Sequence, residues 1–398
     1  MKIADVQAHL LSVAEDSDDP YMVSLGPRSG CLIQITTDDG LTGLGETYAG
    51  FYAPEATGSL VGLYRRHLLG RDPLRVRGLW EELVARSKWW GRNSLPIFVL
   101  SGIEQALWDL SGKVAGMPVY QLLGGATKDK QRVYASCASS PWPVERTVAM
   151  VRGQVERGHK AVKFDLGYYP RQDYTSLESF IEDERHKLRA LRREVGHDVD
   201  LMIDAGQGFD ASPWPAKKAI RIARSLDEFN LAFFEEPCDY ADLEGYAEVR
   251  RGVQTPIAGG ESLTTIHEWR RFLDAGCVDI PQPDASVVGG ISECHRAVTM
   301  AASHHLPVAM HCYGLGVAVA ANLHVALANS NVVFLEFPAR ETSLRNELYH
   351  EPPRFENGYV HLPTAPGLGV ELLPETIARY PFVPETGWQE MFSIGTPE

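Results

Sequence analysis

The sequence predicts an α/β protein in which a TIM-like (β/α) barrel follows a smaller α+β domain. From about residue 131 onward, short apolar runs alternate with amphipathic helical stretches, a pattern typical of parallel βα units. Eight runs of this kind are present, and eight parallel strands close a barrel. Three of the runs end in an acidic residue, and these acids recur at the spacing of one strand, one helix and two loops.

The N-terminal α+β domain is expected to span residues 1–125. Residues 3–11 alternate well enough between apolar and polar side chains to form a strand. An Asp-Asp-Gly turn separates residues 31–37 from residues 42–47, which predicts a hairpin. The clearest helix is predicted over residues 101–115, where apolar side chains share one face and a glycine follows the last of them.

The barrel is expected to span residues 126–357. Amphipathic stretches such as 216–226 and 291–303 are predicted to be helices between its strands. Residues 358–398 show too little periodicity for a further unit, so we expect them to pack back against the N-terminal domain. The predicted strands are residues 132–137, 161–165, 201–204, 231–235, 257–261, 278–284, 308–311 and 333–336.

Composition argues against several partners. The formal net charge of −14 disfavours nucleic acid and anionic membrane surfaces, although a bound cation would still admit an anionic small substrate. The six cysteines show no metal-binding spacing, so we expect buried, reduced thiols and a cytoplasmic location. The N-terminus has no apolar signal core, and polar residues interrupt the apolar stretch 308–327, which favours a barrel interior over a membrane span.

The three acids that end predicted strands are Asp204, Glu235 and Glu261. Because the C-terminal ends of parallel barrel strands converge on one face, we expect these carboxylates to lie close together. They would repel one another unless a cation neutralised them, and an all-oxygen ligand set favours a hard divalent ion, Mg²⁺. The alternative is that each acid caps the helix after its strand, which three acids in the same phase make less favourable.

Five further polar residues lie at predicted strand ends: Lys163, Asp165, Asp284, His311 and Glu336. Asp284 and His311 end neighbouring strands, so the carboxylate could orient the imidazole and raise its basicity. Lys163 and Asp165 are two residues apart and should point to the same side of their strand. A lysine beside a divalent cation could act as a base or stay charged and bind a carboxylate. The alternatives are a core histidine, a helix or turn cap and structural ion pairs.

These residue types together suit removal of a proton α to a carboxylate. That proton is very weakly acidic, and its loss puts a second negative charge on the carboxylate oxygens. A divalent cation on those oxygens would stabilise the enediolate, and a positioned histidine would remove or return the proton.

At these positions the chain resembles the enolase superfamily, and within it the mandelate racemase-like group that includes many acid-sugar dehydratases. The resemblance covers nearly the whole length and includes segments outside the strand ends. These are Ile103-Glu104-Gln105-Ala106-Leu107-Trp108-Asp109, Leu122-Leu123-Gly124-Gly125 and Pro366-Gly367-Leu368-Gly369. It implies a modified (β/α)7β barrel with an N-terminal capping domain, and a homo-oligomer.

The resemblance also assigns roles to residues. The three strand-end acids match the group's metal ligands, and Asp284 and His311 look like its catalytic dyad. Glu336 looks like the eighth-strand acid that hydrogen-bonds the substrate. Two positions depart from the group: Asp165 stands where a second lysine is usual, and Gly206 stands where asparagine is frequent. A carboxylate is a weak base, so two-base racemisation is disfavoured relative to dehydration.

Specificity in this group comes from mobile loops of the capping domain. The matching segments are 16–30 and 46–58, which are rich in Gly, Pro and polar residues. The residues expected to meet a polyhydroxy substrate are Arg28, Tyr48, Tyr52 and Trp89. Alternatively, the aromatic residues only pack the loops down.

We therefore expect a Mg²⁺-dependent dehydratase that converts a sugar acid, an aldonate or aldarate, into a 2-keto-3-deoxy acid. Its base would be His311 or Lys163. A racemase, epimerase or cycloisomerase of the same superfamily is the nearest alternative. A non-catalytic barrel that binds a metal and a ligand is the alternative of another class.

Overall fold

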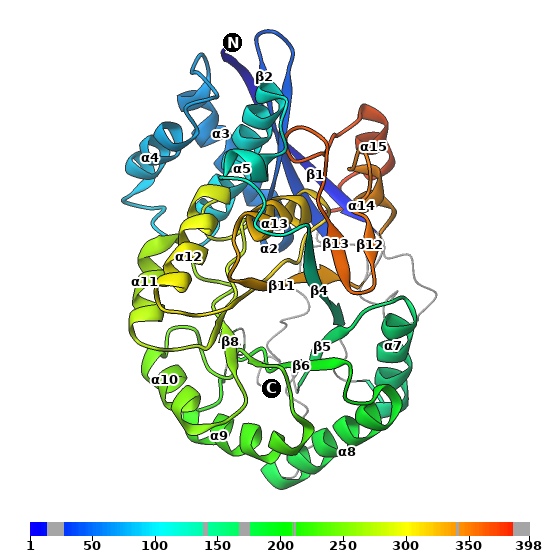
Figure 1. Ribbon diagram of the computed structural model, residues 1–398. Helices are drawn as coiled ribbons and strands as arrows, with labels where there is room; N and C mark the ends of the chain where they lie inside the picture. Colours follow the sequence, from blue (N-terminus) through cyan, green and yellow to red (C-terminus); the bar gives the residue numbers. More distant parts are fainter. Residues whose placement is uncertain are drawn as a thin grey trace.

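The structure is a computed structural model, and it describes residues 1–13, 28–137, 142–166, 176–208, 210, 212–339 and 342–384. An N-terminal α+β domain lies against one side of a parallel barrel whose helices form an arc around the strands (Figure 1). Among the described residues, no helix is both long and apolar enough to cross a membrane. All six cysteines are buried and free of disulfides, as predicted.

The N-terminal domain contains a three-stranded antiparallel sheet in the order β1-β2-β3. The predicted hairpin is confirmed, with Gly40 in its turn at a φ of +87°. The predicted helix is confirmed in α5, which begins earlier than expected and ends at Gly116 with a left-handed φ of 66°. The elements are β1 (Ile3–Val13), β2 (Arg28–Thr37), β3 (Thr42–Thr47), α2 (Ala49–Tyr52), α3 (Pro54–Leu68), α4 (Val76–Ser87), α5 (Leu95–Ala115) and α6 (Val119–Leu122).

The barrel contains all eight predicted strands, with ends that differ from prediction by a few residues. The strands are β4 (Lys130–Cys137), β5 (Ala161–Asp165), β6 (Asp200–Asp204), β7 (Phe234–Glu235), β8 (Ile257–Gly259), β9 (Ile280–Pro281), β10 (Val308–Met310) and β11 (Val332–Pro338). They are parallel in the order β10-β11-β4-β5-β6-β7-β8-β9, and the two end strands contact each other to close the barrel.

Each of the first seven barrel strands is followed by a helix that returns the chain to the next strand. These helices are α7 (Val144–Glu156), α8 (Leu177–Val195), α9 (Ala216–Ser225), α10 (Leu243–Gly252), α11 (Thr265–Asp274), α12 (Ile291–Ser303) and α13 (Val317–Ala328). Within the described residues after β11, the elements are short: α14 (Ser343–Glu347), β12 (Phe355–Glu356), β13 (Tyr359–His361) and α15 (Pro374–Arg379). The barrel is therefore of the (β/α)7β type.

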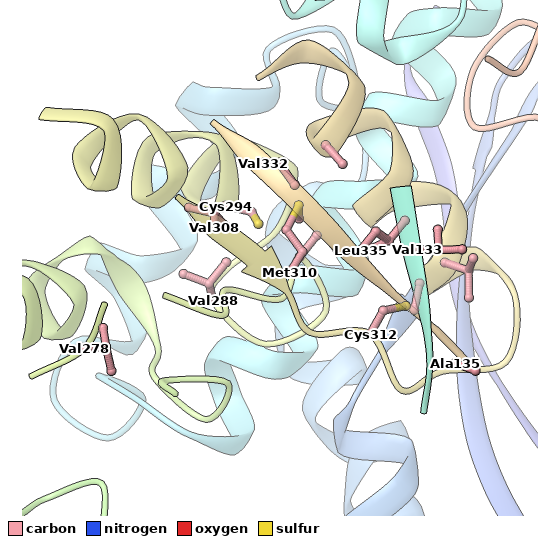
Figure 2. Close-up of a cluster of buried hydrophobic side chains, with 14 of the residues drawn as sticks. Val133, Ala135, Val278, Val288, Cys294, Val308, Met310, Cys312, Val332 and Leu335 are labelled. Carbon is pink, nitrogen blue, oxygen red and sulfur yellow. The ribbon is translucent and has the colours of Figure 1, made fainter. Parts of the chain in front are cut away.

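Alternation along the strands separates two cores. Val133 and Ala135 of β4, Met310 of β10 and Leu335 of β11 belong to the large apolar cluster between the strands and the surrounding helices (Figure 2). The intervening residues point into the barrel, as the two-residue period of a strand requires. One inward-facing residue from each strand, or from the position beside it, forms a separate apolar layer. The layer contains Tyr134, Ala161, Met202, Phe233, Ala258, Ile280, Ala309 and Phe334.

A polar layer lies one inward position further along seven of the eight strands. Each member follows a member of the apolar layer by two residues, so that the same side of the strand faces inward. The polar layer contains Ser136, Lys163, Asp204, Glu235, Gln282, His311 and Glu336. The apolar layer therefore closes the floor of a polar chamber at the C-terminal end of the barrel.

Two buried glutamates of the N-terminal domain hold it against the barrel. Glu46 of β3 accepts hydrogen bonds from the backbone N–H groups of Leu315 at 2.6 Å and Ala318 at 2.8 Å, at the start of α13. Glu104 of α5 accepts from the N–H of Ile291 at 2.6 Å, at the start of α12. A carboxylate at a helix N-terminus satisfies unpaired N–H groups and complements the helix dipole. Two carboxyl groups of the N-terminal domain thus join it to the N-terminal ends of two barrel helices.

One of the two expected lid loops differs from prediction, and most of the other is not described. Residues 46–58 were expected to be a lid loop, but they form the end of β3, α2 and the first turn of α3. Gly50 permits this because a Cβ there would lie 2.2 Å from the backbone nitrogen of Cys31. Most of the other expected lid, 16–30, lies outside the described residues.

The C-terminal segment contacts both domains. Strand β13 pairs antiparallel with β4 of the barrel, a contact that the sequence did not predict. Further along, the N–H of Leu368 donates to Asp109 of α5 at 2.8 Å, which is the expected return to the N-terminal domain.

We predict that Glu104 makes the stability of the protein depend on pH. Burial raises the pKa of Glu104 to about 7 from its ordinary value of 4.5. The folded protein therefore keeps a proton that the unfolded chain releases, so stability present below pH 4.5 is lost as pH rises toward 7. Glu104→Gln removes this dependence. The free energy of unfolding of wild type minus variant should fall by on the order of 3 kcal/mol between pH 4 and pH 8.

Denaturant unfolding across this pH range measures the difference. Glu81→Gln, at an exposed position of α4, controls for the loss of one charge. Parallel stability curves for wild type and Glu104→Gln would contradict the prediction.

Candidate active site

Three carboxylates meet at the mouth of the polar chamber. Asp204 ends β6, Glu235 ends β7 and Glu261 follows β8 by two residues. One oxygen from each lies within 4.8 Å of the others, a spacing that could hold one metal ion. The three acids do not cap the helices that follow, because the N-cap positions of those helices are Pro215, Asp242 and Thr264.

Gly260 places Glu261 in this cluster. Its φ of +99° is in the region that favours glycine, and a Cβ there would lie 2.7 Å from a ring carbon of Trp269. On β8, the inward-facing position comes two residues after Ala258, and that position is occupied by Gly260. The positive φ turns the chain so that the next residue, Glu261, enters the cluster instead.

Lys163 lies among these acids, in the same polar layer. Its ammonium forms an ion pair with Glu235 and lies 3.4 Å from both Asp204 and Glu336. Burial disfavours the charged form, but the surrounding carboxylates outweigh it and raise the pKa of Lys163 well above its usual value. In this arrangement Lys163 is a cation, the second of the two roles expected for it.

Glu236, next to the cluster, is a buried carboxylate without a hydrogen-bond partner among the described residues. It is 1% exposed, and neither of its oxygens accepts a hydrogen bond there. Burial, together with repulsion from Glu261 and Asp204, raises its pKa well above the ordinary range. Its φ of +44° is rarely adopted by residues other than glycine, and such strain clusters at functional sites.

This chemistry fits a divalent cation. The three carboxylates supply only oxygen atoms, as Mg²⁺ and similar hard ions require. Burial and neighbouring carboxylates raise the pKa of Glu235, and a cation would favour its charged form. Asp204, Glu235 and Glu261 could therefore hold the ion, and a cation there would also favour the charged form of Glu236 close by.

Gln282 supports this cluster and was not predicted. Its amide nitrogen donates to Glu235 at 2.7 Å, which fixes the orientation of that carboxylate. Gln282 precedes Asp284 by two residues, and the period of the strand could have revealed it.

The predicted dyad is formed. Nδ1 of His311 lies 2.8 Å from Asp284, whose other oxygen accepts from the Asn322 amide at 2.9 Å and the Ser286 N–H at 2.7 Å. Asn322 lies on α13 and was not predicted, because its place beside Asp284 depends on how that helix packs. With Asp284 bonded to Nδ1, the other ring nitrogen of His311 faces the cluster.

Glu336 faces His311 across the chamber. Nε2 of His311 lies 3.7 Å from Glu336 and 3.6 Å from Glu261. Burial lowers the pKa of His311, but Glu261, Glu336 and Asp284 outweigh this effect and raise it well above the usual value. Burial also acts against the charged form of Glu336, but Lys163 and His311 outweigh it and lower the pKa of that carboxyl.

Of the other predicted site residues, some lie near the cluster or the dyad and one does not. Asp165 ends β5 beside Asp204 in the strand register and is half-buried. The ring of Tyr48 meets that of His311 edge-on, with centroids 5.9 Å apart, and Tyr52 packs against Tyr48 at 5.3 Å. Trp89 is not placed with them, because its side chain is 95% exposed near the end of α4.

Arg28 lies near these aromatic rings. Its guanidinium lies over the ring of Tyr313, with 4.7 Å from its central carbon to the ring centroid. It lines a cavity together with Tyr48.

Two family models match this chain over most of its length. The model described as mandelate racemase / muconate lactonizing enzyme, N-terminal domain, matches residues 6–124. The model described as enolase C-terminal domain-like matches residues 146–376. The first covers the N-terminal sheet and helices, and the second covers most of the barrel and the segment after it.

Known proteins resemble the chain over nearly its full length. It is 32% identical over 392 residues to D-galactarolactone cycloisomerase of Agrobacterium fabrum, covering 96% of this chain and 99% of that protein. It is 31% identical over 353 residues to arabinonate dehydratase of Saccharolobus solfataricus, covering 87% and 89%. The solved structure of 3,6-anhydro-D-galactonate cycloisomerase from Zobellia galactanivorans matches with a TM-score of 0.83 at 29% identity, covering 96% and 99%.

We predict that Mg²⁺ raises the melting temperature of the protein and that Asp204→Asn weakens this effect. The substitution removes one anionic ligand, so the Mg²⁺ concentration needed for half of the stabilisation should rise at least about tenfold. Thermal unfolding at increasing Mg²⁺ concentrations measures this. Asp200→Asn is the matched control, because Asp200 begins the same strand and pairs with Arg132 instead. Equal Mg²⁺ dependence in both variants would contradict the assignment.

Proposed function

Because the chain belongs to the mandelate racemase/muconate lactonizing enzyme family of the enolase superfamily, we propose that it is a Mg²⁺-dependent dehydratase of a sugar acid. The substrate would be an aldonate or aldarate, and the product a 2-keto-3-deoxy acid. The observation that carries the proposal is the position of the His311–Asp284 dyad, whose free ring nitrogen faces the three-carboxylate cluster.

His311 is the proposed base. Burial lowers the pKa of His311 and the carboxylates of Glu261 and Glu336 raise it, so a divalent cation held by the cluster would weaken that rise and favour the neutral ring. Asp284 would then accept the Nδ1–H, which leaves the lone pair of Nε2 directed into the chamber. Asp284 itself is fixed by the Asn322 amide and the Ser286 N–H, so the imidazole keeps one orientation. A substrate bound with its α-carbon over Nε2 would lose its proton to that atom.

The cluster binds the carboxylate end of the substrate in this proposal. A divalent cation held there would stabilise the negative charge that builds on the substrate carboxylate as the proton leaves. Lys163, which stays positively charged among the acids, adds a second positive group on the same side. Glu336 is held by the N–H of Cys312 at 2.9 Å and would accept a hydrogen bond from the substrate.

The β-hydroxyl then departs as water. The electron pair of the broken C–H bond forms the enol double bond, the C–O bond at the β-carbon breaks, and the imidazolium of His311 returns its proton to the departing oxygen. The enol then takes up a proton at the β-carbon and becomes the 2-keto-3-deoxy acid. One histidine thus serves as base and acid in turn, and the second lysine that Asp165 replaces is not needed.

A cycloisomerase is the second candidate. The observation that favours it is the similarity to two proteins named as cycloisomerases, the Agrobacterium and Zobellia proteins. Both candidates begin by removing a proton α to a carboxylate, so the residues named above would serve either. They differ in whether water is lost.

We predict that His311→Asn abolishes turnover and leaves Mg²⁺ binding intact. Removing a general base costs about 10²- to 10⁴-fold in rate, whereas the three carboxylates are unchanged. ¹H NMR in D₂O with Mg²⁺ over a panel of aldonic and aldaric acids measures the reaction. New deuterated 3-deoxy signals, present for wild type and absent for the variant, are the expected result.

Other outcomes decide between the candidates. Loss of the α-proton signal without a deoxy product would reassign the protein as a cycloisomerase or epimerase. Full activity in His311→Asn would contradict the proposed base. His304→Asn, at the end of α12, controls for a histidine substitution outside the chamber.

A further inference from the structure

Glu236 is a buried acceptor that the described side chains leave unsatisfied. It is 1% exposed, and neither of its oxygens accepts a hydrogen bond among the described residues. Buried polar groups in folded proteins nearly always have a partner, so an exception asks what binds there. The ammonium of Lys163 does not serve Glu236, because its ion pairs are with Asp204, Glu235 and Glu336. The donor for Glu236 must therefore come from outside these side chains.

The backbone fixes Glu236 in this position at the cost of strain. Its φ is +44°, which residues other than glycine rarely adopt. Its N–H donates to the carbonyl oxygen of Ala258 at 3.1 Å, and its carbonyl oxygen accepts from the N–H of Gln207 at 3.0 Å. The side chain of Gln207 is itself bonded to the carbonyl oxygen of Ala205 at 2.8 Å and to the N–H of Trp214 at 2.9 Å. Strain that is held by surrounding contacts in this way is characteristic of ligand sites.

Gly208 leaves the room that the Glu236 carboxylate occupies. A Cβ on Gly208 would clash with Oε2 of Glu236 and would lie 3.2 Å from Oε1. The carboxylate therefore lies against the loop that follows β6, the strand that ends in Asp204. The backbone of Gly208 is in a conformation open to other residues, so the close approach of Glu236 is what requires glycine here.

Glu236 lies beside the three-carboxylate cluster but is not one of its members. Glu261 and Asp204 are close enough to repel it. Among the described residues, however, the group whose oxygens lie within 4.8 Å of one another consists of Asp204, Glu235 and Glu261 alone. Mg²⁺ is octahedral and usually keeps several of its water molecules, so three carboxylates do not complete its coordination. Water bound to the ion is a donor that belongs to this place.

We propose that Glu236 holds the divalent cation through water, by accepting hydrogen bonds from water molecules that are bound to the ion. This inference rests on the proposed function, which places the cation at the three carboxylates. An ionised acceptor makes the stronger kind of hydrogen bond, and its charge attracts the ion as well. Groups that bond to the ligands of a metal rather than to the metal commonly tune its affinity. Glu236 is thus a positioning residue for the cation, distinct from the three ligands.

The first experiment measures Mn²⁺ binding to the metal-free protein, without any substrate, from the EPR signal of the free ion. Glu236→Gln keeps the shape of the side chain and removes its charge, so the Kd for Mn²⁺ should rise about tenfold to a hundredfold. Asp204→Asn, which removes a direct ligand, shows the effect of damage to the cluster itself. Glu248→Gln, at an exposed position of α10, is the matched control and should bind Mn²⁺ as the wild type does.

Gly208→Ala tests the position of the carboxylate without changing its charge. The added Cβ displaces Oε2 of Glu236, so the Kd for Mn²⁺ should rise, although by less than in Glu236→Gln. The double variant should show no further loss over Glu236→Gln alone, because the alanine acts through Glu236. Gly62→Ala is the control, since a Cβ there would meet nothing within 4 Å.

Two further measurements separate this role from a purely structural one. In the metal-free protein, Glu236→Gln should raise the melting temperature, because it removes a buried negative charge that Glu261 and Asp204 repel. The rise in melting temperature on addition of Mg²⁺ should become smaller in the same variant. A structural role would shift the melting temperature equally with and without Mg²⁺. ENDOR spectra of bound Mn²⁺ count its water ligands, and their number should be the same in wild type and Glu236→Gln.

Three results would overturn the inference. Wild-type affinity for Mn²⁺ in Glu236→Gln would show that the partner of this carboxylate is something other than the hydrated ion, such as a substrate hydroxyl. One additional water ligand in the variant would make Glu236 a direct ligand. Both results would keep the proposed function, which Asp204→Asn and the reaction in D₂O test separately. Failure of the wild-type protein to bind Mn²⁺ or Mg²⁺ would overturn the inference together with the cation of the proposed function.

Discussion

Repulsion among buried carboxylates is the constraint on which the rest of this structure depends. The (β/α)7β topology brings Asp204, Glu235 and Glu261 to one end of the barrel, and Glu236 and Glu336 lie beside them. Like charges that are this close together and this deeply buried are unfavourable unless opposite charges compensate them. Lys163 and His311 offset part of this repulsion through their contacts with Glu235 and Glu261. A divalent cation, which a cluster of oxygen atoms suits, would offset the rest. The arrangement costs stability, so the surrounding fold must hold it in place.

The apolar layer of the barrel and the N-terminal domain hold these acids and the dyad in place. Beneath the acids, the apolar layer of one residue per strand fills the barrel and excludes water from the floor of the chamber. From the side, Glu46 of the N-terminal domain is bonded to the start of α13. The same helix carries Asn322, which holds Asp284, which in turn holds His311. A carboxylate of the N-terminal domain is thus connected to the dyad through one helix, and the domain contributes to the orientation of the site as well as to its cover.

Much of this arrangement could be predicted because it depends on local periodicity. The two-residue period of a strand and the repeat of the βα unit place Asp204, Glu235, Asp284, His311 and Glu336 on one face. The same period would also have identified Gln282, two residues before Asp284, had it been applied to every strand. It fails at Glu261, where the positive φ of Gly260 shifts the inward position by one residue.

The sequence by itself therefore determined the barrel, its strand order and the chemistry at the strand ends, because alternation and βα spacing are properties of neighbouring residues. Only the tertiary structure decided which distant residues complete the site. Asn322 and Glu46 take their roles from packing between segments far apart in the chain, which no local pattern encodes. The helical form of residues 46–58 and the pairing of β13 with β4 were decided in the same way. Local preference is weak, and contacts between elements override it.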